Sequence, residues 1–551
     1  MSLTEKIILA ALEKLPTTEE GFNVLKRSLM AGEKPETNLP DKTELLVAYH
    51  DLVKNNKILP SEHLERMLMR RAVRSLSGVA VITSLIKPYP CPGQCVYCPF
   101  DERMPKSYLS EEPAAMRALM LEFNPYEQMA RRIEALQNNG HPADKIEFIV
   151  KGGTWNSYTL QYQYWFILKS FEACNTLGQE GVTISTLTED SPLVEIKAEL
   201  AKQQTINETA KHRIIGLTLE TRPDCINYHT IWQMREMGCT RIELGIQHTD
   251  DAILELTKRG HGSKEAMRSM ELLRNYGFKV DAHLMPQLPG ATPEADLKMM
   301  QTIFSDPGYK PDMIKIYPCT VVKNSELYEW FLQGKYTAYS VEDLIDILVK
   351  FKPTIPYYAR ISRLIRDIPG QYIEEGNTVT NLRQVVQLRL KKLGTPCRCL
   401  RCREVGHVDL NKISDLTPHL FVDEYDTHGG TEYFLSFEDK DRTVVFAFCR
   451  LRIVDFASSE LPKEAIRYPA YIRELHTYGK LLNIGVKDDN QSQHKGLGKK
   501  LLEKAEAIVT EHSVDKLAVI SGVGVRDYYR KWGYELENTY MVKNLKNKNS
   551  L

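Results

Sequence analysis

Short apolar runs alternate with amphipathic segments through the middle of the chain. Runs of mainly apolar residues begin at Lys145, Arg213, Arg241, Lys279 and Met313, and stretches with apolar residues at helical spacing separate them. Repeated strand and helix units of this kind predict a parallel sheet covered by helices. We therefore expect an α/β domain over residues 76–390.

The pattern differs before this domain. Residues 1–75 place apolar side chains at helical spacing and contain no alternating β-branched run, which predicts a small helical domain. Its last segment is rich in arginine, and a solvated helix face and a phosphate-binding surface for tRNA are both consistent with this pattern. The arginines are Arg66, Arg70, Arg71 and Arg74.

After residue 410 the pattern changes again. Runs that begin at Thr431, Thr443 and Tyr471 predict successive strands, with polar stretches between them. An amphipathic helix follows from Lys499, and a further strand begins at Leu517. We predict a separate α+β domain over residues 411–551, joined to the preceding domain by a cysteine-rich linker at residues 391–410.

Composition and charge limit the functions and the cellular location that the chain can have. The 551 residues are 42% hydrophobic and carry 72 basic and 72 acidic side chains, so a nucleic acid must be bound by local basic patches rather than by net charge. Residues 360–403 hold ten basic and three acidic residues, which predicts such a surface. Eleven cysteines without a disulfide-like pattern, and no signal peptide or membrane-length apolar run, favour a cytoplasmic protein without a membrane partner.

Three cysteines follow the predicted strand at residues 78–83. Cys91, Cys95 and Cys98 have C-x3-C-x2-C spacing, and a loop with this spacing can bring three thiolates to one centre. A 4Fe-4S cluster is normally held by four thiolates, so three leave one iron open to another ligand. Zinc with a distant fourth ligand, or reduced thiols, are the alternatives. The position after a strand matches barrel enzymes, which keep their chemistry at the carboxyl ends of strands.

Polar and glycine residues follow or end several other predicted strands. Glycine allows a ligand to approach the backbone closely, and paired carboxylate and guanidinium groups bind hydroxyl and carboxylate groups. Each motif alone is weak, because two glycines are often only a turn and Glu with Arg often only an ion pair. Their repeated placement predicts a binding rim made of Lys151, Gly152, Gly153, Glu220, Arg222, Glu243, Gln247, His283, Lys315 and Tyr317.

A second cysteine group lies in the linker. Cys397, Cys399 and Cys402 are too closely spaced for comfortable disulfide pairing but suit a tetrahedral metal, and zinc is the natural choice. We prefer Cys319 as the fourth ligand, because it would tie the linker to the barrel; His407 is nearer in sequence. Reduced thiols without a metal are the alternative.

A glycine-containing loop precedes the helix at Lys499. Such a loop presents backbone N–H groups and the positive end of the helix dipole to phosphate oxygens. Together with the following strand and Tyr528 and Tyr529, it resembles the GNAT acetyltransferases, in which this loop binds the pyrophosphate of coenzyme A and the tyrosines lie beside the thioester. Core packing is the alternative for the two tyrosines. The loop consists of Gln493, His494, Lys495, Gly496, Leu497 and Gly498.

The first cysteine loop resembles that of the radical SAM enzymes, which bind S-adenosylmethionine at the open iron and cleave it to a deoxyadenosyl radical. This resemblance implies a partial (β/α) barrel. Nearly the whole chain resembles the family of the Elongator catalytic subunit, through motifs that begin at Arg74, Glu147, Glu220, Arg366, Arg473 and Val519. Eukaryotic members have a longer gap between the first two cluster cysteines, so this chain resembles a bacterial or archaeal member.

The resemblance implies carboxymethylation of the wobble uridine in the anticodon stem-loop of tRNA. The radical takes a hydrogen from the acetyl methyl of acetyl-CoA, the carbon radical adds to the uracil ring, and hydrolysis releases coenzyme A. Cofactor residues would be Lys151, Gly152, Gly153, Glu220, Arg222 and Glu243, and the residues near the thioester would be Lys315, His476, Tyr478, Tyr528 and Tyr529. The electron donor stays open, and a homodimer or Elongator-like partners are expected.

Two other functions fit parts of the sequence. In a protein lysine acetyltransferase the GNAT domain would move acetyl to an amine, and the iron–sulfur cluster would be structural. In a tRNA-binding scaffold both catalytic domains would be degenerate, and the intact loop of Cys91, Cys95 and Cys98 argues against this. Dependence on S-adenosylmethionine separates the radical enzyme from the acetyltransferase.

Overall fold

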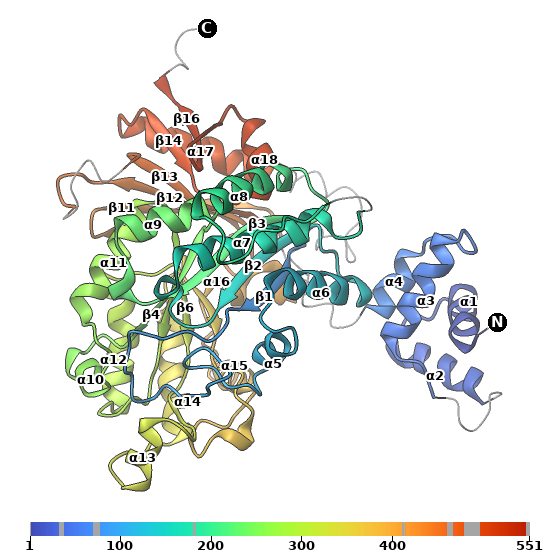
Figure 1. Cartoon of the computed structure of the whole chain (residues 1–551), viewed down its shortest axis with the longest axis horizontal. Helices are drawn as coiled ribbons and strands as arrows, with labels where there is room; N and C mark the ends of the chain where they lie inside the picture. The colour runs from blue at the N-terminus through green and yellow to red at the C-terminus, as the bar shows by residue number, and fades with distance from the viewer. Residues whose placement is uncertain are drawn as a thin grey trace.

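The first four helices form a small unit at one end of the molecule (Figure 1). The computed structural model describes residues 2–31, 38–69, 78–179, 183–409, 413, 415–459, 467–478 and 496–546. Ile7, Phe22, Leu45 and Tyr49 form the core of the helical unit, which confirms the helical prediction. The side chain of Arg66 and residues 70–75 lie outside the described residues. The four helices are α1 Leu3–Lys14, α2 Glu19–Met30, α3 Lys42–Lys54 and α4 Glu62–Leu68.

A seven-stranded, all-parallel sheet curls into an open half barrel in the middle of the chain, as predicted. Strands β5 and β6 are buried on both faces, which explains their nearly continuous apolar runs. The strands, in sheet order, are β1 Ala80–Leu85, β2 Lys145–Lys151, β3 Arg213–Thr221, β4 Arg241–Gln247, β5 Lys279–Leu284, β6 Met313–Ile316 and β8 Arg360–Arg363.

Helices connect these strands and cover the sheet. In α14, Ser340 caps the first turn, and Leu344, Ile347 and Leu348 lie on the buried face, as expected for an amphipathic helix. The helices are α5 Pro113–Met120, α6 Pro125–Asn138, α7 Leu160–Thr176, α8 Leu193–Asn207, α9 Tyr228–Glu236, α10 Asp251–Leu256, α11 Ser263–Asn275, α12 Pro293–Ser305, α13 Glu326–Leu332, α14 Val341–Phe351, α15 Leu382–Lys392 and α16 Leu400–Arg403. A small ladder joins β7 Thr320–Val321 to β9 Glu375–Gly376.

The C-terminal region contains a second seven-stranded sheet, mostly antiparallel, with its own apolar core. Helix α17 Leu497–Glu511 contacts β11, β12 and β13 of this sheet, and the short helix α18 Arg526–Arg530 follows β14. In sheet order the strands are β10 His419–Thr427, β11 Gly430–Glu438, β12 Val445–Val454, β13 Ala470–Thr477, β14 Lys516–Val519, β16 Tyr540–Asn544 and β15 Glu535–Glu537.

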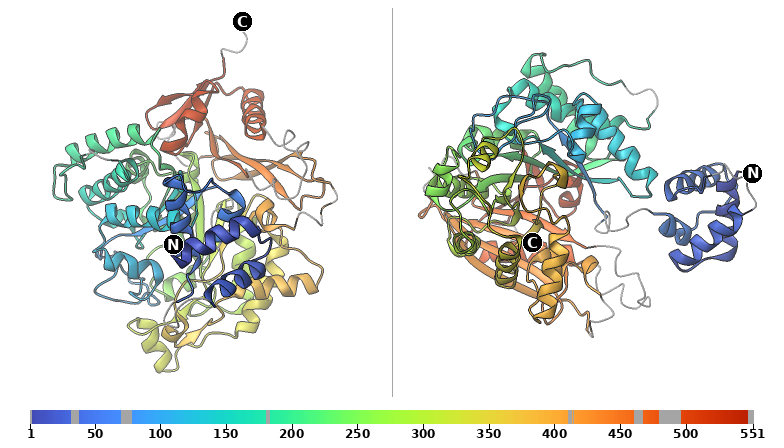
Figure 2. Two further views of the ribbon diagram at one scale, coloured as in Figure 1. Left: turned by 90° about the vertical axis from the view of Figure 1, so that its right-hand side faces the viewer. Right: turned by 90° about the horizontal axis from the view of Figure 1, so that it is seen from below.

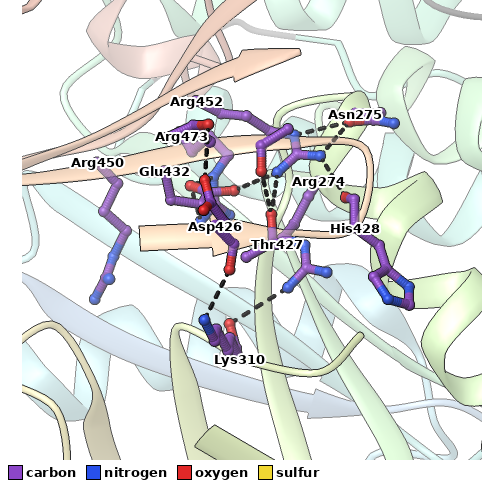
Figure 3. A network of polar contacts seen from close by, with 12 residues as sticks. Arg274, Asn275, Lys310, Asp426, Thr427, His428, Glu432, Arg450, Arg452 and Arg473 are labelled. Atoms are coloured by element: carbon purple, nitrogen blue, oxygen red, sulfur yellow. Dashed lines mark hydrogen bonds and ion pairs between the residues drawn. The ribbon is translucent and has the colours of Figure 1, made fainter. Parts of the chain in front are cut away.

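The second sheet packs against the amino-terminal ends of the barrel strands, the end opposite the cysteine loop (Figures 1 and 2). A polar network crosses this contact (Figure 3). Arg452 of β12 donates to Asn275 at 2.5 Å and to Glu432 at 2.8 Å in buried hydrogen bonds, and Lys310 donates to the carbonyl oxygen of Asp426 at 2.8 Å in an exposed one. None of the helices in the described ranges is both long and apolar enough to cross a lipid bilayer.

Candidate functional site

Cys91, Cys95 and Cys98 lie on the loop that leaves the carboxyl end of β1. The loop is held from two sides: the backbone N–H of Val96 donates to the carbonyl of Thr257 at 3.2 Å, and its carbonyl accepts from Leu327 at 2.8 Å. The loop therefore has a defined shape before any ligand binds.

Two arginines stabilise this loop. Arg259 donates through Nη1 to Sγ of Cys95 at 3.3 Å, and Arg222 does so at 3.7 Å while its Nη2 donates to the carbonyl oxygen of Arg259 at 2.7 Å. The hydrogen bond from Cys98 and the positive charge of Arg259 lower the pKa of Cys95 to about 3, although burial opposes them. Cys95 thus favours the thiolate, the form that binds metals, whereas its hydrogen bond with Cys98 and burial raise the pKa of Cys98. Arg259 was not predicted from the sequence, because it lies 164 positions from Cys95 and belongs to no motif.

The linker cysteines form a compact group of thiols. The sulfur atoms of Cys397, Cys399 and Cys402 all lie within 4.8 Å of one another, whereas the cysteines of the β1 loop form no such group in the described parts of the chain. Four zinc–sulfur bonds of about 2.3 Å require sulfur atoms about 3.8 Å apart. The linker cysteines therefore fit a single ion.

A glycine turn lies beside the cysteine loop. Gly152 has φ 140° and Gly153 has φ 87°, values that disfavour any other residue. A Cβ at Gly152 would lie 2.1 Å from a side-chain carbon of Ile86, so the turn also leaves no room for one. The next residue, Thr154, places its hydroxyl 3.5 Å from Sγ of Cys91. The predicted glycine position and the predicted cluster loop are therefore brought together.

Five charged or ionisable side chains meet inside the barrel. Glu243 of β4 accepts from Nζ of Lys315 at 2.5 Å and from Nε2 of His283 at 3.2 Å, and it also pairs with Lys151. Glu220 lies 3.8 Å from Nζ of Lys151 and 3.7 Å from Nδ1 of His283. The rim residues of five successive strands, β2 to β6, thus form one polar cluster around two carboxylates.

This cluster shifts its own pKa values. Burial alone would raise the pKa of Glu243, but Lys151 and Lys315 hold it well below the usual range. Burial lowers the pKa of Lys315 to about 8, although Glu243 opposes the shift. A lysine that titrates near neutral pH is suited to proton transfer as well as to binding.

The remaining rim candidates are Tyr317, Gln247 and Arg222. The ring of Tyr317 meets the edge of His283, with 5.5 Å between the ring centres, and Tyr108, which the sequence did not indicate, donates to Glu220 at 2.7 Å. Gln247 ends β4 with φ 72°. Arg222 is engaged by Asp224 and by the cysteine loop, so its role toward a cofactor stays a prediction.

The linker cysteines connect the two sheets. The N–H of Leu400 donates to the carbonyl of Ala359 at 2.8 Å, just before β8. Arg403 donates to the carbonyl of Tyr357 at 2.5 Å and to Glu438 of β11 at 2.6 Å. A metal held by Cys397, Cys399 and Cys402 would therefore stabilise a segment that contacts both parts of the molecule.

The preference for Cys319 as the fourth ligand was wrong. Cys319 follows β6 on the carboxyl side of the barrel, where it packs in one apolar cluster with Val96 and Tyr336. The linker group lies near the amino end of β8, at the opposite end of the strands. His407, the other candidate, has its Nε2 3.6 Å from Glu404. Among the described residues, neither His407 nor Cys319 joins the group of three sulfur atoms.

Strands β13 and β14 of the second sheet separate beside the glycine turn that begins α17. Strands β13 and β14 pair only through Tyr471 with Ala518 and Ile472 with Val519, although β13 continues to Thr477. Gly496 caps α17 with φ 85°. A Cβ at Gly498 would lie 2.9 Å from the hydroxyl of Tyr528 and 3.2 Å from the side chain of Thr477. The predicted Gly498 and Tyr528 therefore lie together, beside the end of β13. Gln493, His494 and Lys495 lie outside the described residues.

The two tyrosines have different surroundings. Tyr529 is 6% exposed and lies in the apolar core with Tyr534 and Leu501, where burial raises its pKa. Tyr528 is only partly buried and contacts the turn at Gly498. Core packing therefore describes Tyr529, and Tyr528 is the tyrosine beside the glycine turn.

His476 and Tyr478 lie near the end of β13. The rings of His476 and Tyr478 have centres 4.4 Å apart, and His476 also stacks on Phe448 at 5.6 Å. Burial lowers the pKa of His476 to about 4, so the imidazole is neutral at pH 7. Its Nε2 is buried and has no hydrogen-bond partner among the described residues. A neutral imidazole with a free nitrogen is suited to act as a base.

In the fold, residues 360–403 form a smaller basic surface than their ten basic and three acidic residues suggest. Acidic residues outside this range pair with several of its arginines, for example Glu112 with Arg366 at 2.6 Å and Glu342 with Arg389 at 2.6 Å. Arg363 pairs with Asp367 inside the range at 2.6 Å. The local charge count therefore overstated the basic surface, and exposed Lys391 and Lys392 are among the residues that could still contribute to it.

Comparison with known proteins agrees with this geometry. The sequence profile described as the Radical SAM superfamily matches residues 88–303, and that of the Radical_SAM C-terminal domain matches residues 311–392. The chain is 42% identical to the tRNA uridine(34) acetyltransferase of Dehalococcoides mccartyi, over 87% of this chain and 100% of that protein. It is 36% identical to human Elongator complex protein 3, over 87% of this chain and 86% of that protein.

A solved structure is similar over the same extent. The archaeal Methanocaldococcus infernus Elp3 with an N-terminal deletion superimposes with a TM-score of 0.70 at 37% identity, covering 85% of this chain and 99% of that chain. The half barrel, the linker and the second sheet are thus similar to one known architecture.

Proposed function

Because this chain belongs to the family of Elongator complex protein 3 and the tRNA uridine(34) acetyltransferases, we propose that it carboxymethylates the wobble uridine of tRNA with S-adenosylmethionine and acetyl-CoA. One observation carries the proposal. A loop of three cysteines lies at one end of the barrel, and the glycine turn at Gly498, with Tyr528 beside it, belongs to the part of the same chain that packs against the other end through a buried polar interface.

At the radical site, Cys91, Cys95 and Cys98 would hold a 4Fe-4S cluster. When bound, the cluster and S-adenosylmethionine supply a radical able to remove a hydrogen atom from the acetyl methyl group. Gly152 and Gly153 allow the cofactor to approach the backbone, and the carboxylates of Glu220 and Glu243 offer acceptors for hydroxyl and amino groups.

At the acyl site, the free N–H groups at the start of α17 would bind the pyrophosphate of coenzyme A near Gly496 and Gly498. Neutral His476 would accept the proton of the water that attacks the thioester, and the hydroxyl of Tyr528 would orient the acyl group. The Lys315 side chain, with its lowered pKa, would position the base or the thioester inside the barrel.

The proposal includes the division of the chain into a helical domain that contacts tRNA (1–75), a radical SAM domain (76–390), a zinc linker (391–410) and a GNAT domain (411–551). The width of the group formed by Cys397, Cys399 and Cys402 supports zinc in the linker. A wobble base must leave its loop to react, which fits the recognition of single-stranded RNA by stacking and backbone contacts.

The proposal is tested by anaerobic reconstitution with tRNA, acetyl-CoA, S-adenosylmethionine and a reductant, followed by mass spectrometry of the nucleosides. We expect 5-carboxymethyluridine from the native protein and none from Cys98→Ser. If the native protein has a full cluster and binds tRNA but forms no modified uridine, the proposal is wrong, and acetyl transfer to protein amines becomes the leading function.

A further inference from the structure

The short helix α18, which carries Tyr528, is held by a residue from the other half of the molecule. Glu208 follows α8, between β2 and β3 of the barrel. Its Oε1 accepts from Nη1 of Arg526 at 3.0 Å, and its Oε2 accepts from Nη1 of Arg530 at 2.5 Å. One carboxylate thus joins both ends of a five-residue helix.

The Glu208–Arg526 part of this contact is largely removed from solvent. Glu208 is 9% exposed and Arg526 is 5% exposed, whereas the side chain of Arg530 is 40% exposed. Burial lowers the pKa of Arg526, while the hydrogen bond and charge of Glu208 oppose this shift. Removing one partner of such a buried pair leaves an uncompensated charge, which is far more costly than the loss of an exposed ion pair.

The segment that enters α18 lies directly on β3. A Cβ at Gly522 would lie 1.9 Å from the carbonyl oxygen of Ile215, and one at Gly524 would lie 2.5 Å from Cβ of Arg213. The backbone therefore approaches the barrel as closely as glycine permits. Helix α18 is fixed at its entry by this contact and along its flank by Glu208.

Tyr528 projects from the helix held in this way. Its hydroxyl lies at the turn of Gly498, on the first turn of α17, while Arg526 and Arg530 lie two positions to either side of it in the chain. A displacement of α18 would therefore move the tyrosine relative to the glycine turn. No residue of the second sheet needs to change for this to happen.

We propose that Glu208 is a positioning residue for the acyl site, so that the radical SAM part of the chain completes the site in which the GNAT part binds acetyl-CoA. This inference rests on the proposed acetyl-CoA function. It extends that function by assigning control of thioester binding and hydrolysis to a residue outside the GNAT domain, through Tyr528.

The test compares Glu208→Ala and Glu208→Gln with Glu195→Ala, an exposed residue on α8, in the full reconstituted chain. Acetyl-CoA affinity is measured by calorimetry, and thioester hydrolysis by thiol release in the full reaction with tRNA and S-adenosylmethionine. Because a small misplacement of a positioned group costs up to about 100-fold, we expect at least a tenfold loss of hydrolysis in both Glu208 variants. Iron content, reductive cleavage of S-adenosylmethionine and the Glu195→Ala variant should match the native protein.

A double-mutant cycle separates positioning from general stability. If Glu208 acts through Tyr528, combining Glu208→Ala with Tyr528→Phe lowers hydrolysis no further than the more impaired single variant. Independent, additive losses would overturn the inference, and so would native affinity and hydrolysis in both Glu208 variants. Glu208→Gln keeps the side-chain volume in case Glu208→Ala does not fold. If the native protein itself binds no acetyl-CoA, the proposed function fails instead.

Discussion

Arg473 of β13 forms a bidentate ion pair with Asp312 at the amino end of β6. Its Nη1 donates to Oδ2 at 2.7 Å and its Nη2 to Oδ1 at 2.5 Å, and each side chain is only 1% exposed. Asp312 also accepts from the backbone N–H of Val280 in β5, and Arg473 also pairs with Glu432 of β11 at 2.9 Å. The pair therefore joins the two sheets through groups that are tied to both.

Replacement of Arg473 by methionine should destabilise the protein by about 3–5 kcal/mol, because Asp312 and Glu432 lose a buried cation. Urea unfolding followed by circular dichroism measures the loss. The matched control is Lys516→Met, whose pair with Glu537 is nearly half exposed and should contribute less than about 1 kcal/mol. Equal losses in the two variants would show that the buried pair does not hold the sheets together.

The linker cysteines should bind zinc independently of Cys319. We expect about one zinc per native chain, a strong reduction in Cys399→Ser and no reduction in Cys319→Ser, because Cys319 lies at the other end of the barrel. Metal analysis of protein purified without added zinc measures this. Zinc loss in Cys319→Ser, with an unchanged far-ultraviolet spectrum, would restore that residue as a ligand.

The two neighbouring tyrosines should respond differently. Tyr528→Phe should lower acetyl-CoA hydrolysis by about 100-fold with little change in stability, because its hydroxyl lies at the glycine turn of α17. Tyr529→Ala should instead cost about 3–5 kcal/mol of stability, because it leaves a cavity in the core. Thiol release and thermal unfolding of both variants provide the comparison. Reversed effects would exchange the roles assigned to them.

The hydrolysis rate should be nearly constant from pH 5.5 to pH 7.5. A base is active when deprotonated. Because burial lowers the pKa of His476 to about 4, protonation of His476 should reduce the rate only below pH 5.5. An ordinary histidine would give a decline through about pH 6.5. The rate at saturating acetyl-CoA is measured across the range, with His476→Ala giving the background. A decline centred near pH 6.5 would contradict a buried, neutral His476.

The sequence predicted the barrel well where the pattern reflects burial on both faces. The predicted run at residues 279–284 coincides with β5, whose interior positions are all buried. Strands β8 and β10 are among those that the sequence did not predict. Strand β8, Arg360–Arg363, has only four residues and two of them are arginines, and β10, His419–Thr427, is a largely exposed edge strand with charged residues.

Functional residues were predictable only where a local motif marks them. Cys95 and Gly152 belong to such motifs, whereas Arg259 and Glu208 act across 164 and 318 positions and follow no pattern. The error at Cys319 has the same origin. A cysteine at the end of a strand indicates a barrel end, but the sequence does not state at which end the distant linker docks.

The central claim is that the acetyl group bound by the second sheet reacts at the radical site of the barrel. The most direct measurement uses acetyl-CoA with three methyl deuterium atoms, in a single turnover with tRNA and S-adenosylmethionine. The account predicts one deuterium in the 5′-deoxyadenosine and two in the carboxymethyl group of the uridine. Formation of carboxymethyluridine with no deuterium in either product would contradict the account.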